Sequence, residues 1–250
     1  MLLHTLRTQA DYFGPLLERL DMTDLDVIAV DLPGHGRSSA PAVEYDAGYF
    51  SDAVATLIEK LDLREITLVG DSIGATIALT LAARGNARVR RVIAVNPYDY
   101  GRYGGIRRSS PLARILFTAI LWPAIGPLVA RAETRAILRR VLYGGLYDRR
   151  VLNDDLLGEL FRCGSLPGHA RALGSLSRHW RSWIAARRGY PNIALPVTLV
   201  YGDHDWSRPA ERNANAQAIR GAEVVVLARC GHFASLEQPD AVARLIAAEA

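Results

Sequence analysis

Residues 66–84 have the sequence ITLVGDSIGATIALTLAAR, and the fold is best inferred from this stretch outward. Its first five residues form a short apolar run of the kind expected for a buried strand of a parallel sheet. Its second part, from Ile73 onward, is rich in alanine, leucine and isoleucine and predicts a buried helix. The turn between the two predicted elements is Gly70-Asp71-Ser72-Ile73-Gly74, which places a serine between two glycines at a strand-to-helix junction.

This pentapeptide matches the pattern G-x-S-x-G. A residue at so sharp a turn has a strained backbone, which requires small residues two positions before and two positions after it. The turn exposes the Ser72 hydroxyl at the end of the sheet, and the N-terminus of the following helix favours negative charge. We therefore predict that Ser72 is a nucleophile and that the Ile73 N–H is one oxyanion donor. The alternative, in which Gly-Asp-Ser is only a helix cap, is less favoured because of the strand–turn–helix context.

Strands and helices alternate on both sides of this stretch, which predicts an α/β fold with a mostly parallel sheet flanked by helices. Further strands are predicted at 27–31, 89–95, 196–202 and 224–227. Further helices are predicted at 12–20, at 50–61 with Ser51 as the candidate N-cap, after Pro209 and from Leu236.

Residues 98–190 interrupt this alternation with helical patterns that are broken by glycine and proline, and they contain no convincing pair of strands. We interpret them as an insertion between two strands of the sheet. Ligands of such sheets bind beyond the carboxyl ends of the strands, where an insertion would form a lid. The predicted organisation is therefore an α/β core in two parts, residues 1–97 and 191–250, with a helical lid at 98–190.

At 250 residues, half of them hydrophobic and 22% charged, the chain is long enough for one α/β domain with an insertion. The formal net charge of +4 is unevenly placed, because residues 98–190 hold 16 arginines and only 6 acidic residues. A solvated arginine-rich surface is the favoured explanation, and attraction of anionic substrates or lipid headgroups is the alternative. No nucleic-acid motif or zinc-ligand spacing accompanies the charge, so neither a nucleic-acid partner nor a metal is predicted.

The amino-terminal residues lack the features of a secretory signal. Residues 115–130 are uncharged, but they are short for a membrane span and contain two prolines and a glycine. We interpret them as a buried or interfacial segment. The two cysteines, Cys163 and Cys230, fit a reducing compartment, with one disulfide left open as an alternative. We expect a cytoplasmic protein, and membrane contact is not favoured.

Serine is a weak nucleophile unless a base removes its proton and an acid orients the base. His232, in Cys230-Gly231-His232-Phe233, follows the last predicted strand and is the candidate base. Asp203 and Asp205 follow the preceding strand, and on the residues alone both are candidates for the acid. Both positions agree with the order serine, acid, histidine that this architecture requires.

Three further motifs give the chain a resemblance to the α/β-hydrolase superfamily over nearly its whole length. Residues 31–38 resemble its D-x-x-G-x-G-x-S turn, residues 202–209 its G-x-x-D…P acid loop, and residues 231–239 its G-H…E-x-P ending. The resemblance implies that Asp205 is the acid, that Asp203 stabilises the loop, and that the insertion is a lid. Serine at position 72 argues against the haloalkane dehalogenases and epoxide hydrolases of this superfamily, which need a carboxylate nucleophile there.

The amino-terminal stretch Leu2-Leu3-His4-Thr5-Leu6 departs from the superfamily pattern. Members normally begin with two further strands, which we expect to be absent here, and then have a strand ending in His-Gly. The residue after that glycine supplies the second oxyanion donor. Because Thr5 takes the place of the glycine, Leu6 is only the positional candidate for this donor, and the geometry of the turn is in question.

These observations predict a serine hydrolase that cleaves a carboxylic ester or related small apolar acyl compound through an acyl-enzyme on Ser72. Opening of a lactone or cleavage of a C–C bond in a diketone would use the same residues. The alternative is a catalytically weak protein that binds a ligand or partner. No cofactor is implied, and the oligomeric state is not predicted. Five apolar lid residues either roof a substrate pocket or merely pack the lid onto the core: Phe117, Ile120, Leu121, Trp122 and Ile125.

Overall fold

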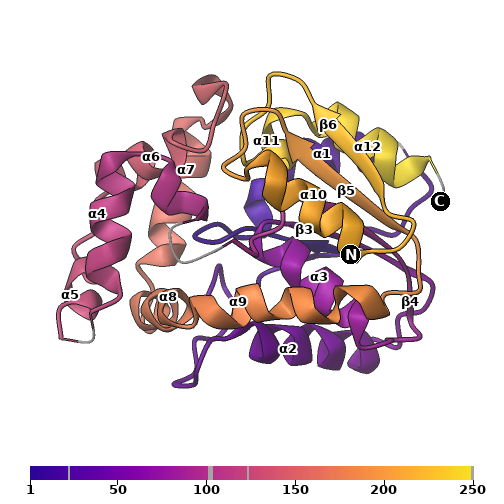
Figure 1. Cartoon of the computed structure of the whole chain (residues 1–250). Coiled ribbons are helices and arrows are strands. Elements are labelled where there is room, and N and C mark those ends of the chain that lie inside the picture. Colours follow the sequence, from indigo (N-terminus) through magenta and orange to yellow (C-terminus); the bar gives the residue numbers. More distant parts are fainter. Residues whose placement is uncertain (22, 101–103, 123, 249–250) are drawn as a thin grey trace.

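The computed structural model of the chain describes residues 1–21, 23–100, 104–122 and 124–248. Its core is one six-stranded sheet in the order β2-β1-β3-β4-β5-β6, and every strand pair among the described residues is parallel (Figure 1). The strands are β1 (Leu2–Leu3), β2 (Ala29–Val30), β3 (Ile66–Asp71), β4 (Val89–Val95), β5 (Val197–Gly202) and β6 (Glu223–Leu227). The predicted α/β class with a parallel sheet is confirmed.

Alternate side chains of the central strands point to opposite faces of the sheet, because successive residues of a strand point to opposite sides. Leu68 of β3 packs in a hydrophobic cluster with α2 (Ala47–Lys60) and α3 (Ile73–Ala83). Its neighbour Val69 packs in a second cluster with α1 (Gly14–Leu20) and α12 (Pro239–Ala247). Helices therefore cover both faces of the sheet, with α2 and α3 below it and α1 and α12 above it in Figure 1.

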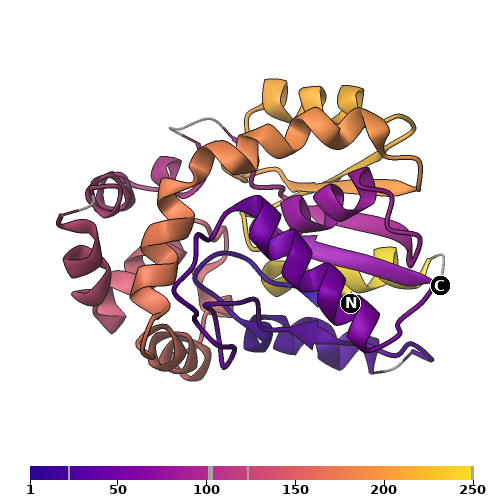
Figure 2. The ribbon, with the colours of Figure 1, turned by 90° about the horizontal axis from the view of Figure 1, so that it is seen from below.

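The chain between β4 and β5 is helical, and most of it lies to one side of the sheet (Figure 1). It comprises η2 (Gly105–Arg108), α4 (Pro111–Ile120), α5 (Gly126–Arg131), α6 (Arg135–Tyr143), η3 (Arg149–Val151), α7 (Asp154–Gly164), α8 (His169–Arg178), α9 (Trp180–Ala186) and η4 (Arg187–Asn192). The last helix differs from the others, since α9 runs back across the core and contacts α2 and α3 (Figure 2). The insertion thus has an outlying part, α4 to α8, and a part that belongs to the core.

The N-cap expected at Ser51 is wrong. The helix begins earlier, at Ala47, and Asp46 caps it by accepting the Tyr49 N–H at 2.7 Å. Ser51 is buried inside the helix, where its hydroxyl donates to the Ala47 carbonyl at 2.7 Å. An aspartate side chain is as good a cap as serine, and the apolar spacing does not show where a helix of this kind starts.

The uncharged stretch 115–130 forms parts of α4 and α5, and no helix among the described residues is long and apolar enough to cross a membrane. The five apolar residues singled out there divide into two groups. Phe117 and Ile120 are buried in the core cluster that also contains α8 side chains. Trp122 and Ile125 are 62% and 39% exposed, so neither of the two alternatives, a roof over an enclosed pocket or packing onto the core, describes them in this structure. Leu121 lies between these extremes.

Candidate functional site

Ser72 lies in the turn between β3 and α3, and its backbone has the positive φ of 58° with ψ of −110°. Such a conformation costs a non-glycine residue about 1–3 kcal/mol and persists only where the surroundings enforce it. Glycine is required on both sides of the turn. A Cβ at Gly70 would lie 2.3 Å from the Gly74 carbonyl, and a Cβ at Gly74 would lie 2.1 Å from the Leu3 carbonyl oxygen. The close approach of β1, β3 and α3 therefore sets the turn that presents Ser72.

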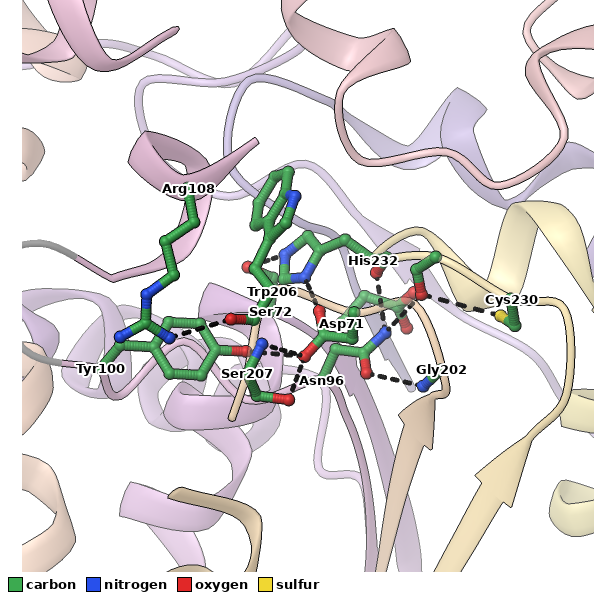
Figure 3. Close-up of polar contacts among 12 residues, drawn as sticks. Asp71, Ser72, Asn96, Tyr100, Arg108, Gly202, Trp206, Ser207, Cys230 and His232 are labelled. Atoms are coloured by element: carbon green, nitrogen blue, oxygen red, sulfur yellow. Dashed lines mark hydrogen bonds and ion pairs between the residues drawn. The ribbon is translucent and has the colours of Figure 1, made fainter. Parts of the chain in front are cut away.

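The structure brings Ser72, His232 and Asp205 into one hydrogen-bonded series. Figure 3 labels Ser72 and His232 in this series. The Ser72 hydroxyl lies 2.8 Å from His232 Nε2, and His232 Nδ1 lies 2.5 Å from Asp205 Oδ1. A carboxylate only accepts hydrogen bonds, so Nδ1 carries the imidazole proton and Nε2 is free to accept the Ser72 proton. This geometry allows the imidazole to act as a base towards the serine.

Asp205 is held as an anion by a full set of donors. Its Oδ2 accepts the Ser207 N–H at 2.9 Å, the Tyr100 hydroxyl at 3.0 Å and the Ser207 hydroxyl. Burial alone would raise the pKa of Asp205, but the neighbouring His232 and the hydrogen bonds from His232 and Ser207 hold this pKa below its ordinary value. Tyr100 is fixed in turn by the guanidinium of Arg108, which lies 5.5 Å from the centre of the tyrosine ring.

Asp203, the competing candidate for the acid, binds the backbone of the loop that carries His232. Its carboxylate accepts the N–H of Arg229 at 2.9 Å and the N–H of Cys230 at 3.0 Å, and it also pairs with the His204 ring at 2.7 Å. The hydrogen bond from Cys230, together with those from His204 and Arg229, holds the pKa of Asp203 well below its usual range. The geometry therefore agrees with Asp205 in contact with His232 and Asp203 in the loop.

Asn96 is a site residue that the sequence analysis missed. It follows β4 with a positive φ of 46°, and its side chain is fully buried. Its amide nitrogen donates to the carbonyl of His232 at 2.9 Å and to that of Gly231 at 3.2 Å, while its amide oxygen accepts the Gly202 N–H at 3.0 Å (Figure 3). One side chain thus ties the end of β4 to the end of β5 and to the His232 loop. The available signal was a lone polar residue before Pro97 at a strand end.

Two further carboxylates hold the loops around the site. Buried Asp71 accepts the Tyr12 hydroxyl at 2.7 Å and the Ser235 hydroxyl at 2.8 Å, and burial raises the pKa of Asp71 to about 6. Glu237, from the motif after His232, accepts the N–H groups of Gly231 at 2.7 Å and Tyr147 at 2.6 Å. The second contact attaches the insertion to the loop of His232.

The ring and the backbone of His232 are both held in place by neighbouring residues. The Trp206 ring stacks on it with 3.9 Å between ring centres, and the Trp206 indole N–H donates to the Gly144 carbonyl at 3.0 Å. The His232 N–H donates to the Gly145 carbonyl at 2.6 Å. Residues of the insertion therefore touch the base directly, and both Ser72 and His232 are only 1% exposed.

The two candidate oxyanion donors lie on adjoining segments, because the carbonyl of Leu3 directly abuts the first turn of α3. Ile73 is the first residue of α3, and no hydrogen bond joins its N–H or the Leu6 N–H to another described residue. Among the described residues of this turn, the positive φ falls on Arg7, at 65°, and not on Thr5. The backbone of Thr5 therefore lies outside the left-handed conformations that favour glycine.

His4 holds this turn in a single tautomer. Its Nε2 accepts the Leu32 N–H at 3.0 Å, so its Nδ1 carries the proton that is donated to the Thr5 carbonyl at 2.8 Å. Burial lowers the pKa of His4 to about 4, and the ring is neutral near pH 7. The described residues contain no group of three or more histidine, cysteine, aspartate or glutamate side chains able to hold a metal ion. Cys163 and Cys230 are both free and buried.

Comparison with known proteins agrees with this geometry. Residues 2–245 match the family described as the alpha/beta hydrolase family. The 2-hydroxymuconate semialdehyde hydrolase of Pseudomonas sp. (strain CF600) is 28% identical over 230 residues, which cover 88% of this chain and 74% of that protein.

Two solved structures share the fold. Cfl2 from Burkholderia cenocepacia has a TM-score of 0.83 at 22% identity, covering 98% of this chain and 85% of its own. The enol-lactonase from Burkholderia xenovorans LB400 has a TM-score of 0.74 at 24% identity, covering 98% of this chain and 88% of its own. The resemblance seen in the sequence motifs is confirmed, and the chain belongs to the alpha/beta hydrolase family.

Proposed function

We propose that this chain is a serine hydrolase that cleaves a carboxylic ester or a related acyl compound through an acyl-enzyme on Ser72. The observation that carries the proposal is the continuous series from the Ser72 hydroxyl through His232 to Asp205. Membership of a hydrolase family agrees with it. In this proposal His232 is the base and Asp205 is the orienting acid.

The reaction begins when Ser72 Oγ attacks the carbonyl carbon of the substrate and the hydroxyl proton passes to His232 Nε2. The resulting imidazolium is stabilised by Asp205, whose depressed pKa keeps it ionised. The N–H of Ile73, and that of Leu6 as the candidate second donor, bind the oxyanion. His232 then protonates the leaving group, and a water activated by His232 hydrolyses the acyl-enzyme.

The type of bond that is cleaved depends on the substrate, because Ser72, His232 and Asp205 can act on several kinds of carbonyl compound. A lactone would open on Ser72 in the same way, and a C–C bond of a diketone would be cleaved with a carbanion as the leaving group. The relatives include proteins named for such substrates, a 2-hydroxymuconate semialdehyde hydrolase and an enol-lactonase. We therefore propose a small organic carbonyl compound as the substrate, and the free cysteines fit action in the cytoplasm.

We further propose that the insertion, residues 98–190, acts as a lid over a core formed by residues 1–97 and 191–250. Ser72 and His232 are buried, and the Gly145 carbonyl of the insertion accepts the His232 N–H. A substrate reaches Ser72 only when a covering segment moves. The burial of Ser72 and His232 also favours the second candidate function, a protein that binds a ligand but turns it over slowly.

Labelling with a fluorophosphonate tests the proposal, because only a serine activated by a base reacts quickly with this reagent. We expect labelling of the native chain and none of Ser72→Ala, while Ser165→Ala, an exposed serine outside the site, labels normally. Circular dichroism checks that each variant is folded. Equal labelling of the native chain and Ser72→Ala would refute the serine hydrolase, and labelling without turnover of short-chain nitrophenyl esters would favour the binding protein.

A further inference from the structure

The outer surface of the insertion carries a hollow that the proposed reaction does not use. Its volume is about 400 Å³, and it lies between the start of α4 and the helix α6. Its lining consists of Ser109, Ser110, Ala136, Arg139, Arg140, Tyr143, Gly144 and Arg149. Three of these residues are arginines and none is acidic, so the hollow is a concentrated region of positive charge.

The positive charge of the hollow is only partly compensated. Arg139 pairs with Asp154 at 2.5 Å, but Asp154 also pairs with Arg135 at 3.6 Å and its side chain is 78% exposed. Within the described ranges, Arg140 and Arg149 form no ion pair, and the Arg149 guanidinium lies 5.4 Å from the centre of the Tyr143 ring. The nearby Asp148 is bound by Arg150 at 2.8 Å. At least two guanidinium groups are therefore available to an anion.

Hydroxyl groups on the opposite wall add donors to these cations. Ser110 caps α4 by accepting the Ala113 N–H at 3.1 Å, which leaves its own proton for another acceptor. The Ser109 hydroxyl oxygen is buried and has no hydrogen-bond partner among the residues described. Each of these two hydroxyl groups therefore keeps a proton that no described residue accepts. The N-terminus of α4 adds a further positive potential to this wall.

We propose that this hollow binds the phosphate group of an anionic ligand. Arginine pairs with phosphate through two parallel N–H···O bonds, and serine hydroxyls complete the coordination of the remaining oxygens. The phosphate belongs either to a soluble phosphate monoester or to a lipid headgroup. The hollow shares Gly144 with the surroundings of His232, but phosphate binding is measured without a substrate, so its test is independent of the proposed hydrolysis.

Exposed apolar side chains elsewhere in the insertion distinguish the two sources of phosphate. Ile115, Trp122 and Leu128 are 67%, 62% and 63% exposed, and they lie between Arg114 and Arg131. From residue 100 to residue 132 the sequence contains five arginines and no acidic residue. A bilayer with anionic headgroups engages both the hollow and these apolar side chains, whereas a soluble ester engages the hollow alone.

Titration calorimetry with inorganic phosphate at low ionic strength tests the site itself. We expect binding to the native chain and a loss of affinity of about tenfold or more in the double variant Arg140→Gln with Arg149→Gln. The control is Arg64→Gln with Arg84→Gln, which removes the same charge from exposed arginines of the core and should change the affinity less than about twofold. Thermal unfolding verifies that both double variants are folded. An equal loss in the control, or no phosphate binding by the native chain, would overturn the proposal.

Co-sedimentation with lipid vesicles shows whether the bound phosphate group belongs to a lipid headgroup or to a soluble ester. If the phosphate is a lipid headgroup, phosphatidylglycerol vesicles bind the native chain and phosphatidylcholine vesicles do not. Binding is then reduced in the hollow variant and also in Trp122→Ser with Leu128→Ser, although the latter keeps its affinity for inorganic phosphate. If the phosphate is that of a soluble ester, inorganic phosphate binds and neither vesicle does. Vesicle binding that is insensitive to the hollow variant contradicts a phosphate site in the hollow.

Discussion

At the carboxyl ends of β3 and β5, the side chains of Ser72 and Asp205 are buried, and hydrogen-bond donors or acceptors contact each of them. On the outer face of the insertion, Trp122 and Arg149 are exposed. In the first region hydrogen bonds hold the polar side chains in place, because burying a polar group without hydrogen-bond partners costs free energy of folding. In the second region the side chains can be replaced at little cost, because an exposed side chain contributes little to the stability of the fold. We therefore expect the reacting groups of such a chain to lie in the core, and the residues that select its ligands to lie in the insertion.

The largest effect should come from the two aspartates of the acid loop. Asp205→Asn removes the anion that orients His232 and should lower kcat for an ester about 10⁴-fold. Asp203→Asn should change kcat far less and instead lower the free energy of unfolding by about 1–3 kcal/mol, because Asp203 accepts two backbone N–H groups of the loop. Ester kinetics and urea unfolding of both variants make the comparison. The reverse ranking in kcat would assign the acid to Asp203.

The serine turn should tolerate no side chain at position 74. Gly74→Ala places a Cβ 2.1 Å from the Leu3 carbonyl oxygen, and we expect a loss of about 3 kcal/mol or more in the free energy of unfolding. Gly14→Ala is the matched control, because a Cβ there meets no atom within 4 Å and the residue has an ordinary φ of −44°. Similar urea midpoints for the two variants would show that the turn is not as tightly packed as the structure indicates.

The buried carboxyl beside Ser72 predicts a pH dependence of stability. Burial raises the pKa of Asp71 from 3.8 to about 6, so between these pH values the folded chain keeps a proton that the unfolded chain has lost. The free energy of unfolding should therefore fall by up to about 3 kcal/mol as the pH rises from 4 to 6. Asp71→Asn should remove this part of the fall. Asp99, whose pKa burial also raises to about 6, contributes in the same direction and is tested separately by Asp99→Asn.

Parallel unfolding curves for the native chain and Asp71→Asn between pH 4 and 6 would contradict this assignment. The difference between the two curves isolates Asp71, since all other titrating groups are common to both proteins.

The smallest effect should come from the exposed apolar side chains of the insertion. Trp122→Ser and Leu128→Ser should each change the free energy of unfolding by no more than about 0.5 kcal/mol, because neither side chain is packed in a hydrophobic cluster. Urea unfolding at two protein concentrations checks this. A loss of more than about 1.5 kcal/mol that depends on concentration would mean that copies of the chain bury this surface against one another.

Local patterns were sufficient for the elements of the core and for the candidate site residues that the structure brings together. Residues 66–70 and 89–95 were predicted as strands and form β3 and β4, because an apolar run bounded by turn residues has few other stable conformations. The strained turn at Ser72 was also predictable, because the strand, the two glycines, the serine and the helix all lie next to one another in the sequence. The family resemblance then selected Asp205 over Asp203, and the structure places Asp205 in contact with His232.

Contacts between distant segments were not predictable, because no local pattern encodes them. Asn96 meets Gly231 and His232, 135 and 136 residues away, and Asp71 meets Ser235, 164 residues away. The same holds for the insertion, where the uncharged stretch is apolar throughout but Phe117 and Ile120 are buried in the core cluster while Trp122 and Leu128 are exposed. By itself the sequence determined the order in which the candidate nucleophile, acid and base follow successive strands along the chain. Tertiary structure alone decided which polar side chains brace that site and which apolar ones face water, because burial depends on what the rest of the fold places opposite each residue.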